Sequence, residues 1–306
     1  MTDQMYVIVV MAPPGTLFNR MLIENAVSAV QGQVVEAHRV AVPVTLADHR
    51  EVSKFLIDCP DPERLSAQLR QLSDEHGADI ALQSRLSRCL PYGLAVFDMD
   101  STLISCEAID ELARVAGVGA EVAEITDRAM RGELDFDESF RTRLALLEGL
   151  DAGAVDELAD QLPVQSGLSE MATTLKARGL KLAIFSGGFI PIAERLKNDY
   201  GFDHVVANGL EIRDGKVTGK IIPPIVNREY KAEALGALAS RLGIHTEHCI
   251  AVGDGANDLS MMALAGLGVA FHAKPAVRAA SPIEITHIGL DGVCYLMGHE
   301  GEFAAA

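Results

Sequence analysis

The sequence lacks the segments that would place a protein in or across a membrane. None of its apolar runs reaches about 18 residues, the length needed for a membrane-spanning helix. Residues 1–4 carry no basic stretch of the kind that opens a secretory signal. The five cysteines are scattered, odd in number and without a CxxC pair, which is typical of reduced thiols. We therefore expect a cytoplasmic protein.

Basic residues are also scarce. The chain has 26 lysines and arginines against 43 aspartates and glutamates, for a net charge of −17. Surfaces that bind nucleic acid neutralise phosphates with clusters of lysine and arginine, and this sequence shows no such cluster. An anionic substrate approaching so acidic a chain would need a metal ion or a few well-placed cations to hold it.

The 306 residues suffice for two domains, each with its own core. In residues 1–86, strands are expected at 5–11, 33–44, 51–57 and 78–82, and helices at 16–31 and 62–76. This βαββαβ order is the split βαβ arrangement of ferredoxin-like modules, and it resembles the ACT-type modules that bind small amino acids or pair sheets between subunits. The resemblance implies serine binding near Gly15 and a homodimer formed through edge strands. A dimerisation or solubility module without a ligand fits the sequence equally well.

Residues 87–306 predict an α/β domain that is interrupted by helices. A short buried strand at 93–96 follows the connection at 84–92. Helices are then expected at 107–115, 120–130, 136–147 and 154–161, and from residue 168 strands and helices alternate again, with strands at 180–185, 249–252 and 267–271 and a hairpin at 210–222. We interpret 87–104 and 163–306 as a parallel-sheet core, and 105–162 as a helical cap over the carboxyl end of its first strand.

Polar side chains follow three of the predicted strands. They are Asp98 and Asp100 after the first, Ser186 after the second, and Asp254, Asn257 and Asp258 after the third. In open parallel sheets, ligands bind beyond the carboxyl ends of the strands. Carboxylates that converge there repel one another unless a cation lies between them, and an oxygen-only ligand set favours Mg²⁺, which would also hold a phosphate. Taken alone, the turn at 97–102 would suit helix capping as well as catalysis.

Four ordered segments resemble the motifs of the haloacid dehalogenase-like phosphatases. They are Asp98-Met99-Asp100-Ser101-Thr102, Ser186-Gly187-Gly188, Lys231 and Gly253-Asp254-Gly255-Ala256-Asn257-Asp258. The sequence around 97–107, 136–143 and 252–262 is similar, more narrowly, to the phosphoserine phosphatases. The resemblance covers residues 87–297 and implies a Rossmann-like core with an inserted helical cap, here preceded by the ferredoxin-like domain.

The resemblance also implies roles for the carboxylates of the first motif. Asp98 would attack phosphorus and form an aspartyl-phosphate. Asp100 would protonate the departing alkoxide and then deprotonate the water that hydrolyses the intermediate, which requires a pKa raised toward neutrality. Mg²⁺ would be held by the carboxylates of Asp98 and Asp254 and by the backbone carbonyl of Asp100.

The remaining core residues would hold the phosphoryl group. Ser186 and the amide of Gly187 would donate to its oxygens at a helix N-terminus, and Lys231 would neutralise its charge. Asn257 would assist at the substrate, and Asp258 would position Lys231 or the waters of the metal from the second shell.

Substrate choice is assigned to the cap. By resemblance to phosphoserine phosphatases, Glu107 would bind the ammonium group of phosphoserine, Arg143 its carboxylate, and Phe136 would close over it. Arg141 is the alternative carboxylate ligand, although a helix would send it to a different face from Arg143.

The sequence thus predicts a Mg²⁺-dependent phosphoserine phosphatase, a phosphoric monoester hydrolase that releases L-serine and phosphate in the last step of serine synthesis. Two alternatives stay open. One is a related phosphomonoesterase or phosphotransferase acting on phosphohomoserine or phosphocholine, and the other is an amino-acid sensor with a vestigial phosphatase domain.

Overall fold

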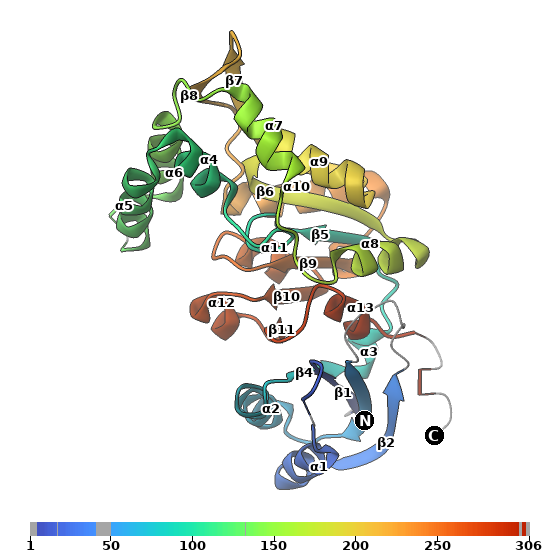
Figure 1. Cartoon of the computed structure of the whole chain (residues 1–306). Helices are drawn as coiled ribbons and strands as arrows, with labels where there is room; N and C mark the ends of the chain where they lie inside the picture. Colours follow the sequence, from blue (N-terminus) through green and yellow to red (C-terminus); the bar gives the residue numbers. More distant parts are fainter. Residues whose placement is uncertain (1–4, 17, 41–49, 132, 300–301, 304–306) are drawn as a thin grey trace.

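The computed structural model describes residues 5–16, 18–40, 50–131, 133–299 and 302–303. These residues build two β-sheets, one from each end of the chain, with helices packed around both (Figure 1). In this described part, no helix combines the length and the apolar character needed to cross a membrane.

The N-terminal unit consists of β1 (Met5–Ala12), α1 (Arg20–Ala29), β2 (Gln33–Val40), β3 (Glu51–Asp58), α2 (Pro62–His76) and β4 (Asp79–Ser84). Its antiparallel strands lie in the order β2-β3-β1-β4, so the predicted βαββαβ order is confirmed. Helix α2 has the predicted bounds, because Asp61 caps its N-terminus and Gly77 ends it with a left-handed φ of 61°.

Two predictions for this unit need correction or lie beyond what is described. The helix predicted at 16–31 was too long, because the side chain of Asn19 accepts a hydrogen bond from the Met21 amide and so starts α1 at Arg20. The short helix α3 (Arg85–Arg88) was not predicted. The outer part of the strand predicted at 33–44 falls on residues 41–44, outside the described residues.

The larger sheet has seven strands in the order β11-β10-β9-β5-β6-β7-β8. Its strands are β5 (Leu94–Phe97), β6 (Lys181–Phe189), β7 (His204–Arg213), β8 (Lys216–Ile222), β9 (Cys249–Gly253), β10 (Leu267–Phe271) and β11 (Glu284–Ile285). All neighbours run parallel except the β7–β8 hairpin. The carboxyl ends of β5, β6 and β9 therefore lie at one edge of the sheet, as the sequence predicted.

Helices cover both faces of this sheet. They are α8 (Leu168–Ala177), α9 (Ile190–Tyr200), α10 (Arg228–Leu242), α11 (Leu259–Leu264), α12 (Pro275–Ala280) and α13 (Gly292–Leu296), with a short 3-10 helix η1 (Thr246–His248) before β9. Along β5, Ala95 and Phe97 pack in the core formed with α8 and α9, whereas Leu94 and Val96 pack in the core formed with α10 and α11. Burial on both faces explains why the strands read as continuous apolar runs.

The inserted segment between β5 and β6 forms α4 (Ala108–Ala116), α5 (Gly119–Met130), α6 (Phe136–Ala145) and α7 (Ala152–Asp160). In Figure 1, α4, α5 and α6 stand together beyond the sheet, next to the β7–β8 hairpin, and α7 lies along α9. The four predicted helices are confirmed, with ends shifted by a few residues.

The two units share one interface. Val7, Val9 and Met11 of β1 belong to the same apolar core as α8, α9 and α13, while the opposite face of the N-terminal sheet packs under α1 and α2. Hydrogen bonds and ion pairs also connect the two units. The buried Asp79 carboxylate accepts hydrogen bonds from the amides of residues 286–288, and Glu302 pairs with Lys54 and Arg88.

Candidate active site

A tight turn after β5 aims two carboxylates into the same space. The Asp98 amide still donates to Val252 of β9, and the Met99 carbonyl accepts the amides of residues 102, 103 and 104. Ser101 adopts a left-handed φ of 60° inside this turn. The chain thus reverses immediately after Asp98, so that Asp98 and Asp100 both lie at the carboxyl end of β5.

Asp98, Asp254 and Asp258 form a buried acidic cluster with Lys231. The three carboxylates each bring an oxygen within 4.8 Å of the others. Lys231, on the first turns of α10, donates from Nζ to Asp98 Oδ1 at 2.7 Å and to Asp258 Oδ1 at 2.7 Å. Burial alone would lower the pKa of Lys231, but the charges of Asp258 and Asp98 raise it above its usual value, so the ammonium is held in its charged form.

One lysine does not balance three carboxylates. Burial, followed by repulsion from Asp258, raises the pKa of Asp98 well above its usual range. The same two causes raise the pKa of Asp254 to about 6. A cation placed among these oxygens would remove that repulsion, and hard oxygen ligands suit a divalent ion such as Mg²⁺.

Asp258 is already fully engaged in holding the site together. Its Oδ1 accepts from Lys231 and its Oδ2 accepts from the Gly255 amide at 3.0 Å. Among the described residues, the Asp254 carboxylate accepts a single hydrogen bond, a long one from Thr102 Oγ1 at 3.4 Å. The Asp254 carboxylate is therefore freer than that of Asp258 to bind a cation, while Asp258 holds the Lys231 ammonium in place. Asn257 lies half-buried on the same turn.

Asp100 has the environment of a proton carrier. Its Oδ1 accepts from the Ala108 amide at 2.8 Å, and its Oδ2 from Ser186 Oγ at 3.3 Å. Burial, followed by the charge of Glu107, raises the pKa of Asp100 to about 7, against the opposing effect of the Ala108 hydrogen bond. A carboxyl group with that pKa can give and take a proton near neutral pH.

The segment Ser186–Gly188 faces Asp100, but it is not the helix N-terminus that the sequence analysis expected. It belongs to β6, and α9 begins only at Ile190. The pairing of β6 with β7 shifts between Phe185 and Phe189, so the segment is a bulge at the end of a strand. A Cβ on Gly188 would lie 2.5 Å from Asp100 Oδ2, and only glycine permits this approach.

Two predicted residues of the segment between β5 and β6, Glu107 and Phe136, lie close to the turn after β5 and to the bulge. Glu107 precedes α4 and accepts from Ser101 Oγ at 2.9 Å. Phe136 stacks on Phe140, and its Cζ would lie 3.3 Å from a Cβ on Gly187.

Arg143 and Arg141 differ in how far their side chains are exposed to solvent. Arg141 is exposed, whereas Arg143 is half-buried and its Nε is buried without a hydrogen-bond partner among the described residues. Burial lowers the pKa of Arg143, and the charges of Asp110, Glu107 and Asp100 oppose that effect. The burial of its side chain therefore distinguishes Arg143 from Arg141, the alternative that the sequence left open.

Two polar links were missed by the sequence analysis. The fully buried Asn208 of β7 bonds the Gly187 carbonyl and the Val226 amide. Asn227, which caps α10, donates to Asp137 of α6 at 3.2 Å and so joins the cap to the core. Neither residue lies in one of the four motifs. The position of Asn227 directly before α10 is a capping signal, but nothing in the sequence indicates the burial of Asn208 or the partners of either residue.

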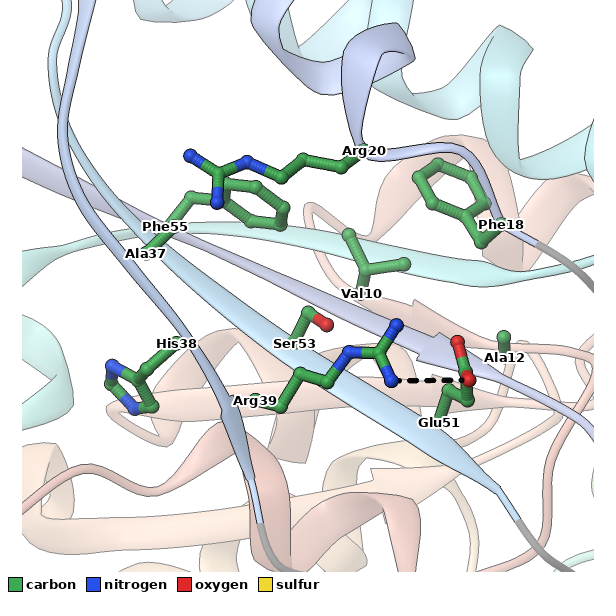
Figure 2. Close-up of a pocket in the computed structure, with 10 residues that line it drawn as sticks. All are labelled: Val10, Ala12, Phe18, Arg20, Ala37, His38, Arg39, Glu51, Ser53 and Phe55. Atoms are coloured by element: carbon green, nitrogen blue, oxygen red, sulfur yellow. Dashed lines mark ion pairs between the residues drawn. The ribbon is translucent and has the colours of Figure 1, made fainter.

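A separate cavity of about 200 Å³ lies in the N-terminal unit (Figure 2). Residues of β1, β2, β3, the segment before α1 and the first residue of α1 line it, among them Phe18, Arg20, Arg39, Glu51 and Phe55. Arg39 pairs with Glu51, at 3.5 Å. None of the predicted catalytic residues lines this cavity.

Comparison with known families identifies the class of protein to which this chain belongs. The chain belongs to the haloacid dehalogenase-like hydrolases, whose family model matches residues 95–263. This confirms the family and the fold class that the four motifs predicted.

Within that family the chain is similar to phosphoserine phosphatases. It is 44% identical over 250 residues to one from Mycobacterium tuberculosis, covering 79% of this chain and 59% of the relative. It is 38% identical over 291 residues to one from Streptomyces coelicolor, covering 92% of this chain and 70% of the relative. The chain spans 59%, 62% and 65% of the length of the curated relatives from M. tuberculosis, Vibrio cholerae and Haemophilus influenzae.

Solved structures agree with this fold over nearly the whole chain. A HAD family hydrolase from Salmonella enterica serovar Typhi matches with a TM-score of 0.86 and 33% identity, covering 97% of this chain and 99% of that chain. A probable phosphoserine phosphatase from V. cholerae in unliganded form matches with a TM-score of 0.75 and 34% identity, covering 96% of this chain and 86% of that chain.

Phosphatases of this family use a metal ion, and the residues present here fit one. The buried carboxylates of Asp98 and Asp254 lie side by side with raised pKa values, which is the electrostatic signature of a site made to receive a cation.

Proposed function

We propose that this protein is a Mg²⁺-dependent phosphoserine phosphatase that hydrolyses O-phospho-L-serine to L-serine and phosphate, the last step of serine synthesis. The names of its relatives support the proposal. The observation that carries it is Arg143, a half-buried guanidinium whose Nε lacks a partner in the described structure and which interacts electrostatically with Glu107. Phosphoserine brings a carboxylate for Arg143 and an ammonium group for Glu107.

In the proposed reaction, the Asp98 carboxylate attacks phosphorus and the bond from phosphorus to the serine oxygen breaks. Asp100, protonated at this stage, gives its proton to the departing alkoxide. The resulting Asp100 carboxylate then takes a proton from water, whose oxygen attacks the phosphorus of the aspartyl-phosphate, so that phosphate leaves and Asp98 is regenerated.

Further residues of the site would hold the charge on the transferring group. Ser186 Oγ and the Gly187 amide would donate to its oxygens, with Asn257 nearby, and Lys231 would neutralise charge beside Asp98. A divalent cation, held by Asp98, Asp254 and the Asp100 carbonyl, would supply further neutralisation when bound.

Phosphate release from phosphoserine, phosphohomoserine and phosphocholine, with and without Mg²⁺, tests the proposal. We expect Mg²⁺-dependent turnover that is fastest with phosphoserine and is abolished in Asp98→Asn. Faster turnover of phosphocholine would establish the related phosphomonoesterase instead, and the absence of turnover of every ester would establish a vestigial domain.

A matched pair of variants tests Arg143 as the ligand of the substrate carboxylate. Because a hydrogen bond to a charged group contributes about 1.5–3 kcal/mol, Arg143→Ala should lower kcat/KM for phosphoserine about 10²-fold. Phosphocholine has no carboxylate, so its turnover should be spared. Arg141→Ala, on the exposed side of α6, is the control; a larger loss in Arg141→Ala than in Arg143→Ala would reverse the assignment.

We also propose that the N-terminal unit, residues 1–86, is an ACT-like domain that binds serine and pairs with a second copy of the chain. Its βαββαβ order and the cavity of Figure 2 support a ligand site, and β2 is an edge strand. Inhibition of the full chain by L-serine and a dimer in sedimentation are the expected results; a monomer that serine does not affect would refute both. The division into a core of 87–104 and 163–306 and a cap of 105–162, and a cytoplasmic location, are retained as proposals.

A further inference from the structure

The bulge that forms the phosphoryl-binding segment leaves a gap in the sheet. Phe185 of β6 pairs with Val206 of β7, and the next paired residues are Phe189 and Asn208. Three residues of β6, 186–188, therefore face a single residue of β7. A bulge of this kind leaves backbone groups without their ladder partners, and a buried carbonyl without a partner is costly.

The side chain of Asn208 fills this gap. Its Nδ2 donates to the Gly187 carbonyl at 2.6 Å, and Asn208 is fully buried. The side chain thus replaces the backbone hydrogen bond that the bulge removes, at the middle residue of the segment.

The other end of the same amide holds a second part of the site. Asn208 Oδ1 accepts from the Val226 amide at 2.8 Å. Val226 directly precedes Asn227, which caps α10, and the Asn227 carbonyl accepts the Lys231 amide at 3.0 Å. One side chain therefore ties the bulge to the start of the helix that carries Lys231.

The two partners fix the orientation of the Asn208 amide. A backbone N–H can only donate and a backbone carbonyl can only accept, so Oδ1 must face Val226 and Nδ2 must face Gly187. Of the side chains close to asparagine in shape, aspartate lacks the donor when ionised and leucine lacks both groups.

We propose that Asn208 is a positioning residue for phosphoryl transfer, setting the distance between the donors of the bulge and the Lys231 ammonium. It touches no substrate and acts through Gly187 and Val226. The inference rests on the proposed phosphatase function. Since a shift of about 1 Å in a catalytic group can cost 10²-fold in rate, loss of this link is expected to lower kcat about 10²-fold while KM changes less, because the transition state depends most on the aligned donors.

The test compares Asn208→Leu, Asn208→Asp and the control Thr218→Val. Thr218 lies on the same hairpin and donates to Glu211, away from the bulge. For each variant, kcat and KM are measured with phosphoserine and with p-nitrophenyl phosphate, a general phosphatase substrate, together with the melting temperature. We expect Asn208→Leu to lose kcat on both substrates and Thr218→Val to retain it.

Asn208→Asp separates positioning from general damage. An ionised aspartate repels the Gly187 carbonyl, but its protonated form regains a donor, and burial favours that form. Its kcat relative to the wild type should therefore rise as the pH falls from about 8 to about 5.5. A variant that melts lower yet keeps the wild-type kcat, or a kcat ratio that does not change with pH, would overturn the proposal.

The experiment distinguishes a failure of the role proposed for Asn208 from a failure of the proposed function. A wild-type protein that hydrolyses p-nitrophenyl phosphate but not phosphoserine refutes the proposed substrate. The role of Asn208 is then tested by the kcat of its variants on p-nitrophenyl phosphate. If neither ester is hydrolysed, calorimetric binding of inorganic phosphate decides: weaker binding in Asn208→Leu than in Thr218→Val supports the proposal, and equal binding refutes it.

Discussion

Replacing Asp254, one carboxylate of the buried acidic cluster, should make the metal-free protein more stable. In the folded state, burial and the charge of Asp258 raise the pKa of Asp254 from its ordinary 3.8 to about 6. The gap of about two pK units, at about 1.36 kcal/mol each, gives an electrostatic cost of about 3 kcal/mol once the group is ionised in both states.

The pH dependence of this cost has a definite sign. Below about pH 3.8 both states keep the proton and no cost exists. As the pH rises, the unfolded chain loses its proton first, so stability falls until about pH 6 and the full cost persists above it. Asp254→Asn should therefore unfold at a higher temperature than the wild type at about pH 8 in a chelator, by several degrees, and should show little advantage at about pH 4.

Added Mg²⁺ should raise the melting temperature of the wild type but not that of the variant. In the wild type the ion offsets the repulsion and raises the melting temperature, more at about pH 8 than at about pH 5, because protons compete with the metal at low pH. In Asp254→Asn the Mg²⁺ shift should largely vanish. Thermal unfolding followed by circular dichroism measures both effects. The reasoning fails if the variant melts below the wild type at the higher pH, or if Mg²⁺ shifts both proteins equally.

Two further predictions concern the nucleophile and the interface between the units. Asp98→Asn should abolish a phosphoenzyme trapped by acid quenching, whereas Asp100→Asn should still form it and slow the proton-dependent steps by about 10²-fold or more; equal, mild losses in both would contradict the division of roles. Glu302→Ala leaves the buried cations of Lys54 and Arg88 without their carboxylate. It should therefore lower the free energy of unfolding, measured by urea titration, by about 3–5 kcal/mol. An unchanged free energy of unfolding would show that water replaces the ion pairs.

The convergence of the candidate site residues was predictable because the carboxyl ends of parallel strands share one edge of the sheet. Once β5, β6 and β9 are recognised as parallel strands, Asp98, Ser186 and Asp254 must converge, however far apart they lie in the sequence. The bulge at Ser186 was not predictable in form, since Ser-Gly-Gly suits a turn before a helix as well as an interrupted strand.

Long-range polar partners gave no sequence signal. Lys54 and Glu302 are separated by 248 positions, and no local periodicity relates residues so distant. Asn208 lies inside a strand, where pattern analysis treats a polar residue as an exposed one. Its burial follows from the bulge opposite it, which only the tertiary structure reveals.

The small helix α13 has a consequence for how this chain can be divided. All five of its residues are buried, because it lies between α8 and the strand β1 of the N-terminal unit. Because no residue of α13 is exposed to solvent, removing the N-terminal unit would expose apolar residues that are buried in the whole chain. The N-terminal segment is continuous in sequence, yet a chain shortened by it would expose the side of α13 that packs against β1.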